Sequence, residues 1–237
     1  MITYLLVDLD DTLLQNSMEV FAPPYYKALS SYLAEYVAPQ VMLPKLLEGT
    51  DAMIKNTDAS LTLEHAFDRI FYPGIGLSKE KIRPNLDAFY DTIFPTLKKY
   101  TSEIPAAQVM INEALKLGLK IVVATNPLFP LKAIHHRLEW AGLSPKEIPY
   151  TLVASYETFH FAKPNPAYYK EILVKVNANP DECVMVGNDL ENDIQPAKSV
   201  GIHCFRIDND PDNMGQKNGY QSGLQDQVIP WIKSLDS

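Results

Sequence analysis

The chain has few cysteines and no long hydrophobic run, and each shortage excludes a class of protein. Its 237 residues include only two cysteines, Cys183 and Cys204, each inside an apolar run. We therefore expect buried, reduced thiols rather than a disulfide, which fits a reducing cytosol. No stretch approaches the roughly 20 apolar residues that a membrane span needs. These shortages predict a cytoplasmic protein without a membrane partner.

Basic charge is also scarce. The 21 lysine and arginine residues stand against 29 aspartate and glutamate residues, which gives a formal charge of −8. This balance disfavours nucleic acid or an anionic membrane as the main partner. The N-terminal apolar run has no basic residue before it and ends in acidic residues, so no export signal is expected. The composition points to a globular protein, and it indicates no protein partner.

The first informative stretch is the apolar run 2–7, which predicts a short buried strand. The strand leads directly into Asp8 and Asp10. Because side chains alternate along a strand, these two carboxylates are expected to point the same way. They would repel each other and need a cation or a shared proton. The alternative at this point is a polar loop that caps a helix.

From residue 15 to residue 100 the pattern is helical. One stripe of apolar and aromatic residues recurs at intervals of three and four: Tyr25, Leu29, Tyr32, Leu33 and Tyr36. The stripe predicts the core of the helices rather than a cofactor site. Further helices are expected at 41–54, 63–71 and 86–97, with breaks at Pro39, Pro73-Gly74 and Pro84. The basic residues expected on a solvated face are Lys79, Lys81 and Arg83.

The remaining chain alternates between helices and strands. Apolar strands are expected at 119–124, 150–155, 183–187 and 202–207. Helices are expected at 106–117, 131–141, 167–176 and 224–235, with a short one ending at Gly201 and a loop at 210–223. Continuous apolar strands separated by helices predict an α/β fold, a parallel sheet with helices on both faces. The expected division is a core of residues 1–15 and 101–237 and an all-helical insert of residues 16–100.

Polar residues follow four of the expected strands. They are Asp8 with Asp10, Thr125 with Asn126, Lys163, and Asp189 with Asp193. Since ligands of parallel sheets bind at the carboxyl ends of the strands, these residues are expected to converge. A divalent cation held by Asp8 and Asp189 would neutralise a phosphate, while Lys163 and Thr125 would bind its oxygens. Oxygen ligands without histidine or cysteine favour Mg²⁺ over zinc.

This order of motifs resembles the haloacid dehalogenase-like superfamily. The matching motifs are Asp-x-Asp-x-Thr at 8–12, Thr125-Asn126, Lys163-Pro164 and Gly-x-Asp-x-x-x-Asp at 187–193. The helical insert looks like the C1-type cap of that superfamily. The resemblance covers the whole chain and implies a Rossmann-like core with an inserted helical cap. The implied activity is Mg²⁺-dependent hydrolysis of a small phosphorylated metabolite through an aspartyl-phosphate.

The resemblance also implies residue roles. Asp8 would attack phosphorus, and Asp10 would protonate the leaving oxygen and then activate water. Lys163 would neutralise charge on Asp8 and on the phosphate, and Thr125 and Asn126 would hold phosphoryl oxygens. Asp193 would support the site by orienting Lys163 or a metal-bound water. The implied Mg²⁺ ligands are Asp8, Asp10 and Asp189.

One position departs from the family pattern, which places an aspartate directly after the glycine of the fourth motif. Here Gly187 is followed by Asn188 and only then by Asp189. A one-residue slip along a continuing strand would turn Asp189 to the other face of the sheet. We expect Asp189 to be the ligand, with Asn188 able to contribute its amide oxygen, since either oxygen suits a hard cation.

Other functions remain open. A phosphomutase needs the same acidic residues, and a non-catalytic protein that binds a phosphorylated metabolite could retain the fold. Carbon–halogen chemistry is disfavoured because Asp10 is present, whereas the dehalogenases lack that acid. A dinucleotide-binding protein would need Gly-x-Gly-x-x-Gly after the first strand, where Asp-Leu-Asp-Asp-Thr stands instead.

Overall fold

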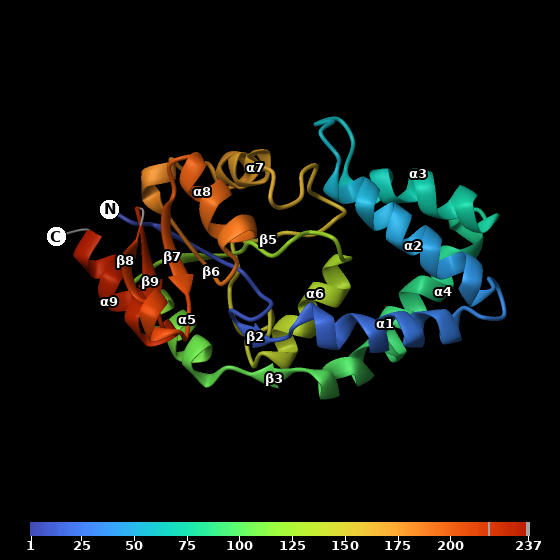
Figure 1. Ribbon diagram of the computed structural model, residues 1–237, viewed down its shortest axis with the longest axis horizontal. Helices are drawn as coiled ribbons and strands as arrows, with labels where there is room; N and C mark the ends of the chain where they lie inside the picture. Colours follow the sequence, from blue (N-terminus) through green and yellow to red (C-terminus); the bar gives the residue numbers. More distant parts are fainter. Residues whose placement is uncertain (218, 236–237) are drawn as a thin grey trace.

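The computed structural model describes residues 1–217 and 219–235, and a seven-stranded sheet forms its centre (Figure 1). The strand order is β5-β4-β1-β6-β7-β9-β8. The strands are β1 (Tyr4–Val7), β4 (Lys120–Val123), β5 (Leu152–Val153), β6 (Cys183–Gly187), β7 (His203–Ile207), β8 (Gly215–Lys217) and β9 (Tyr220–Gly223). Every pairing is parallel except that of β8 with β9.

Strand β1 lies between β4 and β6, and all four of its residues are buried. Val7 is in register with Val123 on one side and with Val186 on the other. A strand covered on both faces and paired at both edges must be apolar throughout, which is what the run before Asp8 shows. The carboxyl end of β1 therefore opens at the middle of the sheet.

Helices cover both faces of the sheet (Figure 1). Helices α5 (Pro105–Lys116) and α9 (Gln225–Leu235) pack together on one face, and α7 (Pro166–Val176) and α8 (Gln195–Ser199) pack on the other. Helix α6 (Leu131–Trp140) follows β4. The short helical turns are η2 (Pro180–Glu182), the π-helical η3 (Leu190–Ile194) and η4 (Pro211–Asn213). The predicted α/β fold class is confirmed.

The helical insert follows β1 and lies at the end of the molecule opposite both termini (Figure 1). It consists of α1 (Met18–Tyr32), α2 (Pro39–Ile54), α3 (Leu63–Ile75), α4 (Lys79–Thr92) and the 3-10 helix η1 (Phe94–Tyr100). The chain enters and leaves it through β2 (Leu14–Gln15) and β3 (Ser102–Glu103), which pair in antiparallel fashion. This two-stranded connection was not expected from the sequence.

The expected helix breaks at Pro73-Gly74 and Pro84 are wrong, whereas Pro39 does begin a helix. Pro73 lies inside α3 and Pro84 inside α4. Each proline removes a backbone donor from its helix. Burial of Phe71 and Ile75 beside Pro73 outweighs that loss, because packing of an apolar face supplies most helical stability in proteins.

The expected loop at 210–223 is also wrong in part, because it contains the hairpin of β8 and β9. Phe205 of β7 is in register with Gln221 of β9 in parallel pairing. Polar residues and glycines dominate the hairpin, so it shows no apolar alternation. Backbone pairing with the sheet edge makes these strands, and a side-chain pattern cannot reveal it.

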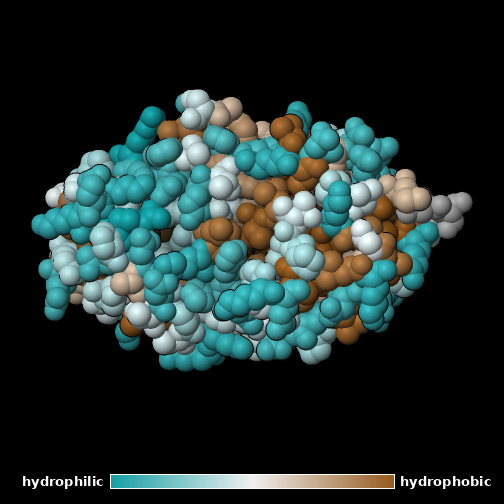
Figure 2. Space-filling model, turned by 180° about the vertical axis from the view of Figure 1, so that it is seen from behind, coloured by the Kyte–Doolittle hydropathy of each residue, from teal (hydrophilic) through white to brown (hydrophobic). Residues whose placement is uncertain are grey.

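On one face of the molecule, hydrophobic side chains gather across the middle, and hydrophilic ones cover most of the rest (Figure 2). Cys183 and Cys204 are buried free thiols, as expected. Among the helices of residues 1–217 and 219–235, none is both long enough and apolar enough for a membrane span.

Candidate active site

A polar pocket opens at the carboxyl ends of the central strands. Its lining residues are Asp8, Asp10, Asp11, Asn16, Met18, Thr125, Asn126, Lys163, Asn188, Asp189, Asn192 and Asp193. All eight residues singled out in the sequence are among them, although they are spread over four strand ends. The structure thus brings the predicted site residues together in one place.

At the base of the pocket, Lys163 joins two carboxylates. Its Nζ lies 2.7 Å from Asp8 Oδ1 and 2.5 Å from Asp193 Oδ1. All three side chains are buried, so both ion pairs are shielded from water. The three formal charges sum to −1. Because Lys163 contacts Oδ1 of Asp8, the other oxygen, Oδ2, is available to a cation or an electrophile.

Backbone contacts place these side chains. The Asp8 amide donates to Val186 O at 2.9 Å and so continues the β1 ladder by one residue. The Lys163 amide donates to Asn126 Oδ1 at 3.2 Å, which ties the lysine loop to the end of β4. A Cβ atom on Gly187 would come within 2.7 Å of three Asp193 side-chain atoms. Glycine is therefore required at 187, because any side chain would displace the carboxylate.

The buried charges shift each other's protonation. Burial raises the pKa of Asp8 to about 7, with Asp193 and Asp10 adding to the rise and Lys163 opposing it. Burial disfavours the charged form of Lys163, but Asp193 and Asp8 outweigh that effect and raise the pKa of its ammonium. Lys163 therefore remains a cation, while Asp8 takes up a proton near neutral pH when no further positive charge is present.

Thr125 and Asn126 form the adjoining wall. Thr125 is buried, and the Tyr168 hydroxyl donates to its backbone oxygen at 2.7 Å, which fixes the end of β4. Both residues line the pocket beside Asp8 and Lys163. A hydroxyl and an amide next to a buried ammonium group are suited to binding an anion.

Asp10 is held away from Lys163 by two donors that the sequence did not reveal. Arg137 NH1 lies 3.0 Å from Asp10 Oδ1 and 2.7 Å from Oδ2, and Asn16 Nδ2 donates to Oδ1 at 2.7 Å. Arg137 comes from α6, is buried, and stacks over the Phe129 ring at 4.7 Å. A buried arginine within an amphipathic helix has the sequence signature of a surface residue, so sequence reasoning missed it.

Asn188 and Asp189 occupy different positions at the end of β6. Asp189 caps the turn η3, with Oδ1 accepting from the amides of Glu191 at 2.8 Å and Asn192 at 3.0 Å. Burial opposes ionisation of Asp189, but the hydrogen bonds from Asn192 and Glu191 prevail and lower its pKa. Asn188 Oδ1 accepts from the Thr12 hydroxyl at 3.3 Å. Both side chains face the pocket, each with oxygen lone pairs to spare.

The oxygen atoms that line the pocket are of the kind that binds a hard divalent cation. They are not, however, arranged as a cluster of three acidic side chains. Within residues 1–217 and 219–235, no three carboxylate, imidazole or thiol groups converge as a metal site would require. Oxygen donors of the pocket include the Asp8 carboxylate, the Asn188 amide and the Asp189 carboxylate. A mixed set of carboxylate and amide oxygens suits Mg²⁺.

Comparisons with known proteins agree with this geometry. The family model of haloacid dehalogenase-like hydrolases matches residues 2–201. A phosphoserine phosphatase of Thermus thermophilus is 23% identical, with 86% of this chain and 88% of that protein covered. A glyceraldehyde 3-phosphate phosphatase of Methanopyrus kandleri is 29% identical over 51% of this chain and 48% of its own length.

The fold is shared with a solved 2-haloacid dehalogenase of Pseudomonas syringae pv. Tomato. The TM-score is 0.64 at 18% identity, and the match covers 99% of both chains. The family model spans most of the chain, including the strand ends that carry Asp8, Lys163 and Asp193. The enzyme class expected from the sequence, a hydrolase, is confirmed. The chain belongs to the haloacid dehalogenase-like hydrolases.

Proposed function

We propose that the protein hydrolyses a small phosphomonoester with Mg²⁺ through an aspartyl-phosphate on Asp8. Family membership and the phosphatase names of its relatives support a phosphatase. The observation that carries the proposal is the buried ion-pair chain Asp8–Lys163–Asp193 at the end of β1. The ion pair holds Oδ1 of Asp8 in place, and Thr125 and Asn126, the proposed ligands of the phosphoryl oxygens, line the same pocket.

In the first step, an Asp8 oxygen attacks phosphorus, and the bond from phosphorus to the leaving oxygen breaks. Asp10 supplies the proton that the leaving alkoxide takes up. In the second step, Asp10 removes a proton from water, which attacks the phosphoryl group, and Asp8 is released. Lys163, Thr125 and Asn126 bind the phosphoryl oxygens throughout.

Mg²⁺ would be held by Asp8 together with oxygens of Asn188, Asp189 and Asp10. When bound, it supplies positive charge that offsets the charge of Asp8 and the phosphate. Asp193 keeps Lys163 directed at Asp8. Of the two candidate Mg²⁺ ligands after Gly187, we favour Asn188, because the Asp189 carboxylate already accepts hydrogen bonds from the amides of η3.

Mg²⁺ binding is expected to depend on pH through Asp8. Its pKa is raised to about 7 in the metal-free protein, and only the carboxylate binds the cation. Apparent affinity should therefore fall about tenfold for each pH unit below about 7 and level off above it. Titration calorimetry across this range measures the effect. Affinity that stays constant down to about pH 5 would contradict the role of Asp8 as ligand.

Arg137 is expected to act as a positioning residue for Asp10. In Arg137→Gln, we expect kcat/KM for an alkyl phosphate to fall about 10²-fold, because Asp10 loses its orienting donor and protonates the leaving oxygen less well. The kcat/KM for 4-nitrophenyl phosphate should fall much less, since nitrophenolate leaves without a proton and kcat/KM does not include hydrolysis of the aspartyl-phosphate, the step that both substrates share. Steady-state kinetics measure both substrates, with Arg137→Lys as a partial rescue and the exposed Arg69→Gln as the control. Equal losses for both substrates would indicate a merely structural role.

We further propose that residues 16–100 form a domain that moves over the core formed by residues 1–15 and 101–237. The paired strands β2 and β3 are the two connections between these parts. Closure would exclude water from the aspartyl-phosphate until Asp10 is in place. The buried free thiols Cys183 and Cys204 support a cytoplasmic location for this activity.

The direct test is hydrolysis of 4-nitrophenyl phosphate with Mg²⁺ and with EDTA. The proposal predicts release of nitrophenol that requires the metal and that inorganic phosphate inhibits. Metal-independent activity, or transfer of the phosphoryl group within a sugar phosphate without net release, would contradict it.

A further inference from the structure

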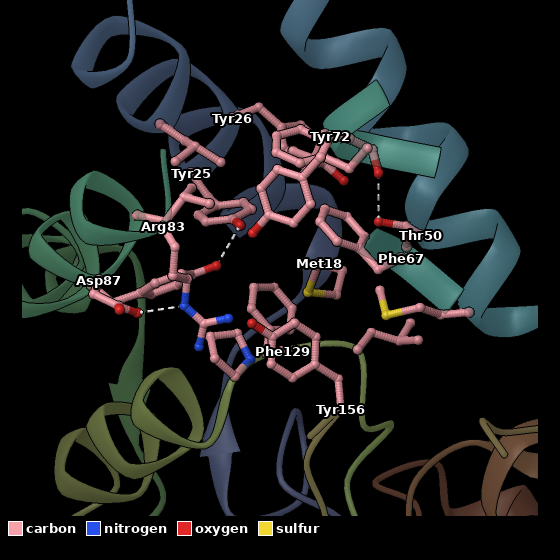
Figure 3. A pocket seen from close by; sticks show the side chains of 18 residues that line it. Met18, Tyr25, Tyr26, Thr50, Phe67, Tyr72, Arg83, Asp87, Phe129 and Tyr156 are labelled. Atoms are coloured by element: carbon pink, nitrogen blue, oxygen red, sulfur yellow. Dashed lines mark hydrogen bonds and ion pairs between the residues drawn. The ribbon is translucent and has the colours of Figure 1, made fainter. Parts of the chain in front are cut away.

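A second pocket lies between the helical insert and the core, and it differs in character from the polar pocket (Figure 3). The space inside it that a water-sized molecule can reach is about 120 Å³. Aromatic and aliphatic side chains dominate its lining, among them Met18, Tyr25, Tyr72, Leu86, Phe129 and Tyr156. We call it the aromatic pocket.

The walls of the aromatic pocket come from both parts of the chain. Tyr26 and Tyr72 lie on the side of the insert, while Phe129 and Tyr156 approach from core loops on the opposite side (Figure 3). The Tyr25 and Phe129 ring centroids are 5.4 Å apart. These two rings are in direct contact, so a flat apolar group would pack against the ring faces that line the interior of the pocket, where each ring offers a large area at little entropic cost. Tyr25, Leu29 and Leu33 of the predicted stripe are buried as expected, and Tyr25 and Leu29 also line this pocket.

The charges of the aromatic pocket are already paired. Arg83 Nε lies 3.0 Å from Asp87 Oδ1, and Arg83 NH1 lies 2.5 Å from Glu64 Oε1. Lys79 also contacts Glu64, at 3.0 Å, and Asp68, at 2.6 Å. Lys79 and Arg83 thus form an ion-pair network with 34% and 29% of their side chains exposed, so the prediction of a solvated face holds in part for both. Among the described residues that line the pocket, Arg83 is the one cation, and these pairs compensate its charge, so it is not free for a second phosphate or a carboxylate.

The aromatic pocket adjoins the polar pocket. Met18, the first residue of α1, lines both. Phe129 lines the aromatic pocket and stacks on Arg137, which binds Asp10. A molecule whose phosphate lies at Asp8 therefore has its leaving group directed past Met18 and Phe129.

We infer that the substrate is a phosphomonoester of an uncharged, largely apolar primary alcohol that carries a ring. The inference rests on the proposed function, because it assigns the leaving group of that reaction. An anionic leaving group would lose its water and find no free cation in the aromatic pocket. A polyhydroxylated one would leave most of the lining unmatched, because that lining is mainly apolar.

Matched primary alkyl phosphates test the inference, because their leaving groups have similar intrinsic reactivity. We expect kcat/KM for 3-phenylpropyl phosphate to exceed that for glycerol 3-phosphate and for O-phosphoserine by at least about 30-fold. Free 3-phenylpropan-1-ol should inhibit competitively, whereas glycerol should not. This inhibition measures binding of the leaving group to the aromatic pocket in the absence of a phosphate.

A matched pair of variants locates the effect. Leu86→Lys places a cation in the aromatic pocket and should reduce the preference for 3-phenylpropyl phosphate over O-phosphoserine by about tenfold or more. Leu47→Lys makes the same change at an exposed position of α2 outside the pocket and should leave the preference unchanged. Should Leu86→Lys fail to fold, inhibition of the wild type by 3-phenylpropan-1-ol decides the question.

The outcomes separate the two proposals. Hydrolysis that favours glycerol 3-phosphate or O-phosphoserine, with no inhibition by 3-phenylpropan-1-ol, overturns the inference and leaves the phosphatase standing. No hydrolysis of any phosphomonoester under Mg²⁺ overturns the proposed function and the inference with it.

Discussion

Replacing Asp8 with asparagine is expected to reduce hydrolysis of 4-nitrophenyl phosphate by roughly 10⁴-fold or more, to the uncatalysed background. The amide is a poor nucleophile and forms no stable phosphoryl intermediate, whereas binding and anion stabilisation by Lys163 persist. Near-wild-type folding is expected, because asparagine fills the same buried space and its oxygen can still accept from Lys163. Steady-state kinetics and thermal unfolding measure the two effects.

Asp11→Asn is the matched control, since Asp11 lines the same pocket and lies three residues after Asp8 in the sequence. Asp11 adopts a positive φ of 55°, which asparagine also tolerates, and its Oδ1 accepts from the Asn16 amide at 2.9 Å. An amide oxygen can replace that acceptor, so activity should change by less than about fivefold. A loss in Asp11→Asn equal to that in Asp8→Asn would contradict the assignment of the nucleophile.

Lys163→Met is expected to lose roughly 10³-fold in activity and to lower the free energy of unfolding by about 3–5 kcal/mol near pH 8. The variant leaves Asp8 and Asp193 buried together without a cation. Without the opposing lysine, the buried Asp8 carboxyl then gains a proton in the folded state at a higher pH than in the unfolded state. Stability should therefore recover as pH falls from about 8 to about 5.5, which urea unfolding at both values measures.

The double variant Lys163→Met/Asp193→Asn separates the electrostatic account from simple loss of packing. Removing the Asp193 charge should restore most of the lost stability near pH 8, while activity stays low because no ammonium group faces the phosphate. If the double variant is as unstable as Lys163→Met, repulsion between the two carboxylates is not the cause.

Much of the fold was predictable because its signals are local. The fully apolar strands β1 and β6 can only be buried between neighbours, and glycines such as Gly118 and Gly142, both with positive φ, end helices where expected. The convergence of Asp8, Lys163 and Asp193 followed from strand-end positions in a parallel sheet, which needs only topology. The family model covers all three of these residues.

What could not be predicted depends on contacts between distant segments. The β8–β9 hairpin exists because β9 pairs with β7, and the β2–β3 connection joins residues about 90 positions apart in the chain. The Arg137–Asp10 contact links α6 to the loop after β1. The aromatic pocket needs side chains from helices and core loops in one place. No local pattern contains this information.

The most direct test of the central claim is fluorine NMR of beryllofluoride binding, because that anion mimics a phosphorylated aspartate and needs no knowledge of the substrate. The account predicts Mg²⁺-dependent bound resonances in the wild type and in Asp11→Asn, and none in Asp8→Asn. Bound resonances that persist in Asp8→Asn, or that are absent from the wild type, would contradict the assignment of Asp8 as the phosphoryl acceptor.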